Sequence, residues 1–346
     1  MKPLANEDLD HILTHTLPLW DCARGRRIFL SGGTGFFGAW LLESLAYCNC
    51  RLNLDLTATV LSRDPEAFSR RIPHLAGNPT IRLLKGDVRD FVFPEENYDF
   101  VIHAAASTTA DAASKPFELL NTLLDGTKRM LTFANARGTK RFLFVSSGAV
   151  YGRQPDHLSH IPEDYLGGPN WLAPTSVYGE GKRVSEQMCS LYARDSDIQF
   201  TSARCFAFAG PHLPMNQHFA IGNFIGDALA GRNIAIQGDG TPMRSYLYAA
   251  DLAIWLWTLL FRGTPAESKL QAYNVGSGKA ISIRDLAQEV VEELDPSLKV
   301  EIAHEPVAGA PPLQYVPDVR KAETQLGLRQ TIGLREAIRR TADWYR

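Results

Sequence analysis

The stretch Ser31-Gly32-Gly33-Thr34-Gly35-Phe36-Phe37-Gly38 decides the fold of this chain. Three of its glycines are spaced three apart, after a short apolar run at 27–30 and before an amphipathic helical pattern. One glycine allows the sharp turn, another lets backbone amides approach a pyrophosphate, and the last permits close packing of helix on strand. The start of the helix offers unpaired N–H donors and a partial positive charge to phosphates. We expect Gly32, Gly35, Phe36, Phe37 and Gly38 to contact a dinucleotide.

Strand and helix patterns alternate on the C-terminal side of this loop. Further strands are predicted at 56–61, 81–84, 99–103 and 141–146, with helical patterns between them, notably 117–136. Alternation of this kind is typical of βαβ units and of a parallel sheet covered on both faces. We therefore predict an α/β fold of the Rossmann type, with a doubly wound parallel sheet.

The regular alternation of strand and helix patterns becomes less clear beyond residue 205. Pro, Gly and Asn become frequent between 207 and 245, and shorter helices are predicted at 249–261, 282–294 and 332–344. We expect a smaller C-terminal substrate-binding lobe within 206–346, interleaved with a dinucleotide-binding domain at 26–205. Residues 1–25 form a predicted helical extension, because their apolar side chains fall at helical spacing.

The amino-acid composition restricts the classes of partner and the cellular compartment that we expect. The 36 basic and 38 acidic residues nearly cancel, so we expect no nucleic-acid partner and no anionic membrane surface. Five scattered cysteines show neither a disulfide framework nor a metal-binding pattern. The acidic N-terminus lacks the apolar core of a signal peptide, and no run of 18 apolar residues exists. We expect a cytoplasmic protein without a metal.

The end of the second predicted strand bears on the choice of cofactor. An acidic residue there would bind the adenosine ribose and indicate NAD. This chain has Ser62-Arg63-Asp64 instead, and a small hydroxyl followed by arginine suits the 2′-phosphate of NADP. We favour NADP over NAD, with Ser62 and Arg63 as its contacts. The alternative is a solvated Arg63 beside an Asp64 that caps the next helix.

Tyr178 and Lys182 are candidates for the chemistry. They are four residues apart, so they share one face if the segment is helical. A phenol with a pKa near 10 is a poor base at neutral pH, and a neighbouring ammonium together with an oxidised nicotinamide would lower that pKa. Ser147 ends the fifth predicted strand, where ligands of open parallel sheets gather, and could hydrogen-bond the reacting oxygen.

Together these motifs resemble the extended short-chain dehydrogenase/reductases, and within them the nucleotide-sugar epimerases and dehydratases. The resemblance covers residues 26–345. The matching segments, in the order found in that family, are Gly32 to Gly38, Asp87-Val88, His103 to Ala106, Asn121, Ser146-Ser147, Val150-Tyr151-Gly152 and Tyr178 to Lys182.

The resemblance implies roles at the cofactor. Asp87 and Val88 are similar to the pair that meets the adenine, and the stretch of Ala104, Ala105 and Ala106 to the segment that lines the cofactor. Phe206 lies in a segment similar to the one that passes the nicotinamide. We expect His103 to pack beneath the cofactor.

The resemblance also implies catalytic roles. Tyr178 would be the base or acid, Lys182 would hold the nicotinamide ribose, and Ser147 would orient the sugar hydroxyl. Asn121 would support the site from the preceding helix.

On the substrate side, the resemblance implies a nucleotide-diphosphate sugar. Asn223 is similar to the edge of the nucleotide pocket, and Arg244 to the arginine that grips the diphosphate. Arginine suits that task because its fork binds phosphate oxygens bidentately.

Three positions depart from the family pattern. Gly148 and Ala149 stand where the dehydratases carry Asp-Glu, and where the related decarboxylases carry a Glu at the second position. Ala207 replaces an asparagine that contacts the diphosphate. The arginine that precedes Pro-Gly-Asp near the C-terminus is missing, and we expect Arg232 or His304 to replace it.

The predicted activity is that of a 4-epimerase or 4-ketoreductase, with hydride transfer at a sugar carbon and Tyr178 as proton shuttle. A 4,6-dehydratase is the first alternative, and it is disfavoured by Gly148 and Ala149. The second alternative is a non-catalytic cofactor sensor on the same fold. The presence of Ser147, Tyr178 and Lys182 disfavours it.

The helices predicted at 117–136 and 177–194 carry more apolar residues than one buried stripe needs. These residues are Phe117, Leu119, Leu120, Leu123, Leu124, Val184, Met188, Leu191 and Tyr192. A large exposed apolar surface usually marks a partner, and two-fold symmetry is the commonest arrangement. We predict a homodimer through a four-helix bundle, as the resemblance also implies. The alternative is that residues 1–25 fold over this face and keep the chain monomeric.

Overall fold

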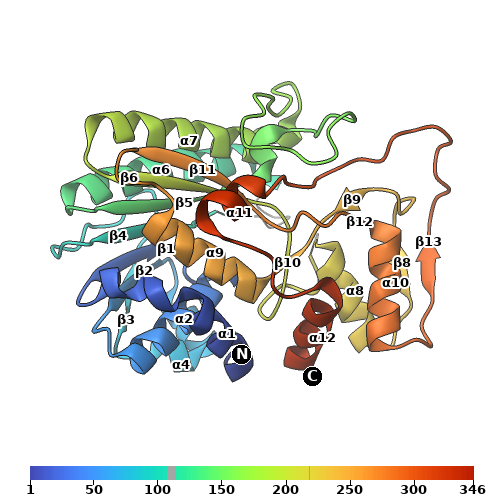
Figure 1. Ribbon diagram of the computed structural model, residues 1–346, viewed down its shortest axis with the longest axis horizontal. Coiled ribbons are helices and arrows are strands. Elements are labelled where there is room, and N and C mark those ends of the chain that lie inside the picture. Colours follow the sequence, from blue (N-terminus) through green and yellow to red (C-terminus); the bar gives the residue numbers. More distant parts are fainter. Residues whose placement is uncertain (107–113, 218) are drawn as a thin grey trace.

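The computed structural model describes residues 1–106, 114–217 and 219–346. Within them, seven parallel strands form the central sheet, in the order β3-β2-β1-β4-β5-β6-β11 (Figure 1). The strands are β1 (Arg27–Ser31), β2 (Thr57–Ser62), β3 (Ile81–Lys85), β4 (Phe100–His103), β5 (Arg141–Ser147), β6 (Gln199–Cys205) and β11 (Leu270–Val275). The order reverses beside β1, as in a Rossmann sheet, so the predicted fold class is confirmed.

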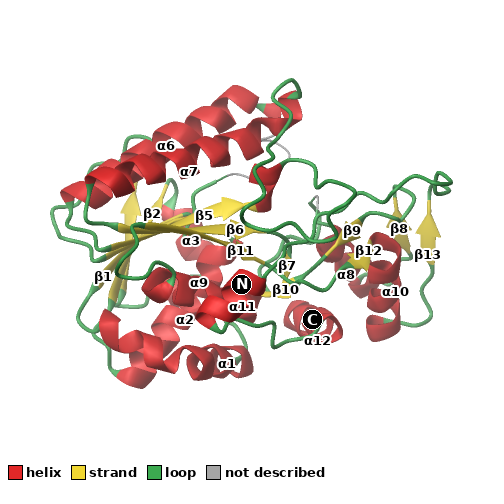
Figure 2. Cartoon of the chain, turned by 45° about the horizontal axis from the view of Figure 1, so that its top comes forward, coloured by secondary structure: helices red, strands yellow, loops and turns green. Residues whose placement is uncertain are grey.

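Helices cover both faces of the sheet (Figure 2). One face carries α6 (Pro116–Ala136) and α7 (Val177–Asp195), and the other carries α2 (Phe36–Leu52) and α9 (Ala249–Arg262). The side chains of β4 are all buried, as expected of a strand between two helical layers. Between β2 and β3 lie the short helices α3 (Pro65–Arg71) and α4 (Pro73–Ala76). The predicted elements from 27 to 194 match the observed bounds to within one residue.

The second lobe stands beside the carboxyl ends of the strands (Figure 1). Its helices are α8 (Ala220–Leu229), α10 (Ile283–Leu294) and α12 (Leu334–Tyr345). Its short strands are β7 (Phe208–Ala209), β8 (Ile234–Ile236), β9 (Met243–Arg244), β10 (Leu247–Tyr248), β12 (Ile281–Ser282) and β13 (Val300–Ile302). The chain returns to the central sheet through α9, β11 and α11 (Arg320–Leu326), so the lobe is built from separate segments. The exact domain boundaries stay a prediction.

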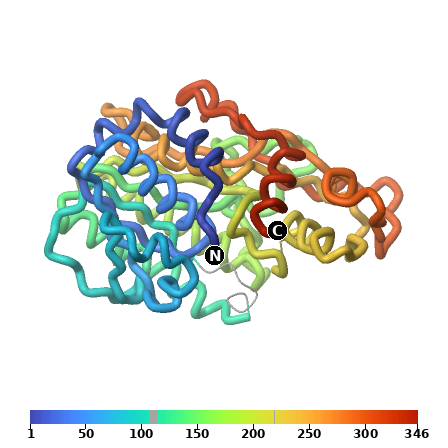
Figure 3. The backbone as a smooth tube through the Cα atoms, turned by 90° about the horizontal axis from the view of Figure 1, so that it is seen from below, coloured from blue at the N-terminus to red at the C-terminus, as the bar shows by residue number. Residues whose placement is uncertain are grey.

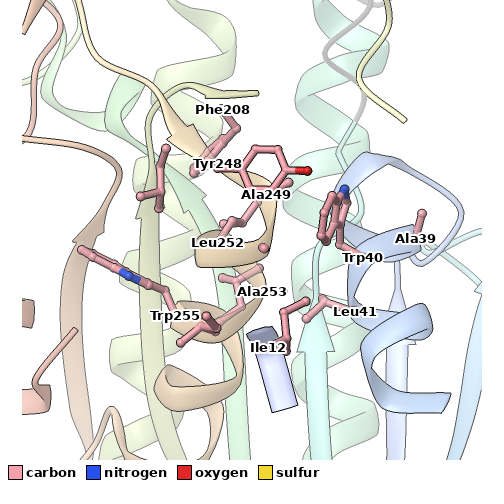
Figure 4. Close-up of a cluster of buried hydrophobic side chains, with 14 of the residues drawn as sticks. Ile12, Ala39, Trp40, Leu41, Phe208, Tyr248, Ala249, Leu252, Ala253 and Trp255 are labelled. Carbon is pink, nitrogen blue, oxygen red and sulfur yellow. The ribbon is translucent and has the colours of Figure 1, made fainter. Parts of the chain in front are cut away.

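The N-terminal extension folds as α1 (Asn6–Thr16) followed by a 3₁₀ helix (Leu17–Ala23). It packs on α2 and α9, where Ile12, Leu41 and Ala253 belong to one buried cluster (Figure 4). Buried Asp8 accepts hydrogen bonds from Tyr248 Oη (2.8 Å) and from Arg340 of α12 (2.7 Å). The two chain ends consequently lie close together (Figure 3).

The alternative in which residues 1–25 cover α6 and α7 is therefore wrong. The extension lies on the opposite face of the sheet, because its apolar stripe is matched by the apolar surfaces of α2 and α9. Among the described helices, none is long and apolar enough to cross a membrane.

Candidate active site

The glycine loop joins β1 to α2, and the space around two of its glycines is closed by backbone. A Cβ on Gly32, whose φ is +76°, would lie 2.5 Å from the carbonyl carbon of Ala104. A Cβ on Gly38 would lie 2.2 Å from the Gly33 oxygen, whereas one on Gly35 would meet its nearest neighbour at 3.5 Å. The loop can therefore lie close to β4 and α2 only with glycine at 32 and 38, and α2 begins with its free N–H groups at the loop.

A cavity of about 1560 Å³ opens between this loop and the second lobe. That volume exceeds the roughly 300–1,000 Å³ of a pocket for one drug-sized ligand, so it suits a dinucleotide with a second ligand. Its lining contains the predicted cofactor contacts Gly32, Gly35, Phe36, Phe37, Ser62, Arg63, Asp87, Val88, Ala104, Ala105, Ala106, Tyr178, Lys182 and Phe206. Gly38 lies behind the lining, packed against Gly33. A dinucleotide therefore fits the residues present.

The part of the cavity lined by Arg63 and Asp87 carries charged side chains. Asp87 is bound by Arg89 through two side-chain hydrogen bonds (2.8 and 3.0 Å), which lower the pKa of its carboxyl. Asp64 accepts from the Ala67 amide (2.9 Å) and caps α3, as the alternative interpretation of this segment proposed. Arg63 is exposed and lines the cavity, so its guanidinium is available to a ligand.

Ser147, Tyr178 and Lys182 meet at the carboxyl end of β5. The Ser147 hydroxyl accepts from the Ala149 amide (3.1 Å), and Ser147 lines the cavity together with Tyr178 and Lys182. Two glycines allow this closeness, because a Cβ on Gly179 would lie 2.5 Å from the Ala149 oxygen and one on Gly181 2.6 Å from the Leu123 side chain. The segment Tyr178 to Lys182 thus brings the start of α7 against β5 and α6.

Lys182 is buried beside β5. Its ammonium donates to the Val145 carbonyl (2.6 Å), and burial lowers its pKa to about 8. Burial raises the pKa of Tyr178 to about 12. That the Lys182 ammonium lowers the pKa of Tyr178 stays a prediction. An oxidised nicotinamide would supply the positive charge that favours the phenolate.

His103 is buried at the end of β4, and its predicted place beneath the cofactor stays a prediction. Its Nδ1 lies 2.7 Å from the Ser31 hydroxyl and its Nε2 3.1 Å from the Thr127 hydroxyl. Burial lowers its pKa to about 3, so the ring is neutral and links β1, β4 and α6.

Two predicted residues are not brought to the cavity. Asn121 lies on the exposed side of α6, and the neighbouring Thr122 lines the cavity instead, because one residue turns a helix by about 100°. Asn223 of α8 also lies outside the lining, and its Oδ1 is buried without a partner among the described residues. Neither Asn121 nor Asn223 lines the cavity, and their roles at the site stay predictions.

Two arginines of the second lobe line the cavity. Arg244 of β9 lines it, as does Arg232, which also binds Asp227 (2.7 Å). His304 is exposed and lies outside the lining, so Arg232 is the better replacement for the missing arginine.

The sequence did not reveal two further cavity residues. Arg71 lines the cavity and donates to the Thr34 carbonyl of the glycine loop, so its charge lies where a pyrophosphate could bind. The sequence did not predict this residue, because no motif marks an arginine late in a short helix. Tyr315 lines the cavity next to Gly148 and stands in a segment without periodicity.

A glycine loop, a cavity for a dinucleotide and a Ser-Tyr-Lys arrangement at a strand end define a Rossmann-type dehydrogenase/reductase. The model of the NAD dependent epimerase/dehydratase family matches residues 28–276, and the chain belongs to this family. It is thus an NAD(P)-dependent enzyme of the extended short-chain dehydrogenase/reductase class.

Relatives with known activities cover most of the chain. UDP-glucuronic acid decarboxylase 3 of Arabidopsis thaliana is 30% identical over 321 residues, which are 92% of this chain and 88% of that protein. UDP-glucuronic acid decarboxylase 1 of Danio rerio is 29% identical, over 92% of this chain and 72% of that protein.

Solved structures of epimerases share the fold. The UDP-glucose 4-epimerase of Thermotoga maritima with UDP-glucose gives a TM-score of 0.78 at 21% identity, over 92% of this chain and 98% of that chain. The UDP-glucose 4-epimerase of Thermus thermophilus in complex with NAD gives 0.73 at 22% identity, with the same coverage.

Proposed function

We propose that the protein transfers a hydride at the C4 carbon of a nucleotide-diphosphate sugar, either as a 4-epimerase, which oxidises and then reduces C4, or as a 4-ketoreductase, which reduces it. The observation that carries the proposal is that Ser147 and Tyr178 line one cavity at the carboxyl end of β5, with room for both ligands. The named relatives and neighbours act on or bind UDP-sugars, which supports a substrate of this class.

The chemistry follows from the hydrogen-bonding capacity of the side chains. The nicotinamide cofactor, when bound, accepts or supplies the hydride. Tyr178 takes the proton of the C4 hydroxyl during oxidation and returns it during reduction. Ser147 would orient the same oxygen, and Lys182, whose ammonium donates to the Val145 carbonyl, would hold the nicotinamide ribose. In an epimerase the keto sugar rotates in the site before the hydride returns to its other face. A reductase instead releases its cofactor after each catalytic cycle.

Gly148 and Ala149 argue against elimination and against decarboxylation. These two residues stand where the dehydratases carry Asp-Glu and where the decarboxylases carry a glutamate at the second position. Neither glycine nor alanine has a side chain that can transfer a proton. A Cβ on Gly148 would lie 2.7 Å from the Phe206 ring and 2.7 Å from the Tyr315 hydroxyl, so the space for an acid is already filled. The missing glutamate at Ala149 supports a reaction other than that of the decarboxylases that the chain resembles in sequence.

A panel of nucleotide sugars tests this function. The purified protein should interconvert C4 epimers among UDP-sugars such as UDP-glucose, or reduce a 4-keto nucleotide sugar with NADPH. A 4-keto-6-deoxy product would favour the 4,6-dehydratase. Cofactor binding without turnover of any member would favour the cofactor sensor and contradict the proposal.

We further propose that NADP is preferred to NAD, because Arg63 lines the cavity where an acid would indicate NAD. Arg63→Ala is expected to weaken NADP binding by about 1.5–3 kcal/mol, the range for hydrogen bonds to charged groups, and to leave NAD binding unchanged. Calorimetric titration of both cofactors measures the difference. Equal affinity of the unmodified protein for the two cofactors would rule out this preference.

For the diphosphate, we propose Arg244 and Arg232 as the clamp. Both line the substrate side of the cavity, and the polar contact of an asparagine is missing at Ala207. Because the chain has almost no net charge, a diphosphate must be bound by local cations, and two arginines can balance its negative charge.

We propose a homodimer through α6 and α7, whose outer faces expose Phe117, Val184 and Leu191. Light scattering is expected to give twice the chain mass of 38.4 kDa. Leu191→Glu should shift the mass to that of one chain, because it would place charges on the two-fold interface. A mass of 38.4 kDa for the unmodified protein at micromolar concentration would contradict the dimer.

We also propose a cytoplasmic location. The five cysteines, scattered without a disulfide framework, support a reducing compartment.

A further inference from the structure

His212 is a buried residue of the cavity lining to which the proposed reaction gives no role. The residue is 7% exposed, and its Nε2 has no hydrogen-bond partner among the described residues. Its φ of +70° lies in the left-handed region, which residues other than glycine rarely adopt. Buried polar atoms usually have partners, and strain of this kind collects at ligand-binding sites. The unpartnered Nε2 therefore indicates a ligand atom in the cavity.

The packing around His212 places it near the start of α2. The neighbouring Pro211 carbonyl accepts a hydrogen bond from the Trp40 indole of α2 (2.9 Å). The His212 ring itself packs on Trp344 of α12, with the ring centres 4.7 Å apart. His212 thus lies between the second lobe and a helix end that favours a phosphate, because that end carries free N–H groups and a partial positive charge.

Arg71 lines the same cavity, and Met1 connects it to His212. The Met1 nitrogen donates to the Arg71 carbonyl (2.5 Å), and the Met1 sulfur lies 3.2 Å from His212 Nδ1. The Arg71 guanidinium donates to the Thr34 carbonyl of the glycine loop, and within the described part of the chain no carboxylate forms an ion pair with it. A guanidinium has five N–H donors, so Arg71 can bind phosphate oxygens while it holds Thr34.

The contact with Met1 fixes which ring nitrogen of His212 carries a hydrogen. A thioether sulfur accepts hydrogen bonds and cannot donate them, so Nδ1 is the donor. Burial lowers the pKa of His212 to about 4, so the free ring is neutral and Nε2 presents a lone pair to the cavity. A phosphate oxygen also presents lone pairs, and the two atoms can form a hydrogen bond only after Nε2 has gained a proton.

We propose that Arg71 and His212 form a diphosphate-binding subsite beside the glycine loop, in which His212 Nε2 takes up a proton from solvent when the diphosphate binds. The protonated ring donates through Nε2 to a phosphate oxygen and through Nδ1 to Met1, so both ring hydrogens have acceptors. The bound anion stabilises the charged ring, which reverses the effect of burial in the free protein. The proposal takes the cofactor and the nucleotide sugar of the proposed function as sources of a diphosphate, and it does not depend on the reaction at C4.

Other titratable groups surround His212 and bear on its charge. The positive charges of Arg71, His74 and the Met1 nitrogen act with burial to lower the pKa of the free ring. On α12, burial raises the pKa of Tyr345 to about 12, so this residue of the cavity lining stays a neutral phenol. His74 is the other imidazole in this group, so a test must separate the two histidines.

Calorimetric titrations with NAD and, separately, with UDP-glucose measure the proton uptake and identify the source of the diphosphate. Both probes carry the diphosphate as a diester, so they take up no proton near neutral pH themselves. In two buffers of different ionisation enthalpy at about pH 6, the unmodified protein should take up about one proton with the probe that occupies the subsite. Its affinity should fall about tenfold per pH unit between the pKa of the free ring and that of the bound ring, because only the protonated ring binds the phosphate.

Three variants assign the proton and the charge to their residues. His212→Gln keeps a hydrogen-bonding side chain that cannot be protonated, and it should abolish the uptake and this pH dependence. The matched control is His74→Gln, whose amide can replace the contact of His74 with Glu43 (2.6 Å) and which should leave the uptake unchanged. Arg71→Gln should weaken binding by roughly 10–150-fold, the loss of a hydrogen bond to a charged group.

Uptake with NAD would assign the subsite to the cofactor, and uptake with UDP-glucose would assign it to the sugar substrate. No uptake with either probe, an unchanged uptake in His212→Gln, or an unchanged affinity in Arg71→Gln would overturn the proposal. The uptake by the unmodified protein and by His74→Gln decides the question even if His212→Gln does not fold. A protein that takes up a proton with NAD and turns over no sugar would keep this proposal and contradict only the proposed reaction.

Discussion

Replacing Tyr178 by phenylalanine is expected to lower turnover by about 10²–10⁴-fold, the contribution of a positioned proton donor and acceptor. The ring of Tyr178 remains, and Tyr178 lines the cavity together with Ser147. Cofactor affinity and the melting temperature should therefore stay close to those of the unmodified protein. Single-turnover rates with the true substrate, measured beside cofactor binding, separate the loss of chemistry from a loss of binding.

The matched control for this prediction is Tyr98→Phe. Tyr98 is buried outside the cavity lining, and its hydroxyl contacts Thr59 (3.0 Å). Its loss should cost stability and leave the turnover unchanged. Near-normal turnover of Tyr178→Phe on the true substrate would remove Tyr178 from the mechanism.

Replacing Gly38 by alanine is expected to damage both stability and cofactor binding. The added Cβ would lie 2.2 Å from the Gly33 oxygen, which is backbone and cannot turn aside as a side chain would. Alanine stabilises a helix interior by up to about 1 kcal/mol relative to glycine, but overpacking costs about 1–3 kcal/mol or more. The net change in the free energy of unfolding is therefore destabilising. Displacing the start of α2 also moves the phosphate donors, and we expect cofactor affinity to fall by more than tenfold.

Gly35→Ala distinguishes the two effects. A Cβ there would meet its nearest protein atom at 3.5 Å, an ordinary contact, yet Gly35 lines the cavity. The melting temperature should hold while cofactor affinity falls. If Gly38→Ala kept the melting temperature and the cofactor affinity of the unmodified protein, this description of the loop would be incorrect.

The fold could be predicted from local patterns, because βαβ units carry their periodicity and their turn glycines within about 30 residues. The strands from 27 to 147 were located to within one residue on this basis. The position of residues 1–25 could not be predicted, because an apolar stripe shows that a helix is buried but not which surface buries it. Here α2 and α9 offered that surface, and Asp8 joined it to Arg340, more than 300 residues away.

In the site, residues at strand ends and in the glycine loop were predictable, because a parallel sheet collects them along one edge. Asn121 does not line the cavity because of its helical phase, since its neighbour Thr122 faces the cavity. Spacing on a helix placed Lys182 near Tyr178, but it could not show that the Lys182 ammonium donates to the Val145 carbonyl. Tyr315 was missed because its place depends on pairing with β9, a contact that no local pattern reports.

The mass of the product formed in heavy water tests the central claim most directly. Oxidation and reduction at C4 move a hydride between the sugar and the nicotinamide, so solvent hydrogen does not enter a carbon–hydrogen bond. The protein, incubated in deuterium oxide with the sugar that it turns over, should give a product without carbon-bound deuterium and without loss of water or carbon dioxide. A product that has lost water or carbon dioxide and carries deuterium at C5 would contradict the claim, because an acid or base would then have acted there despite Gly148 and Ala149.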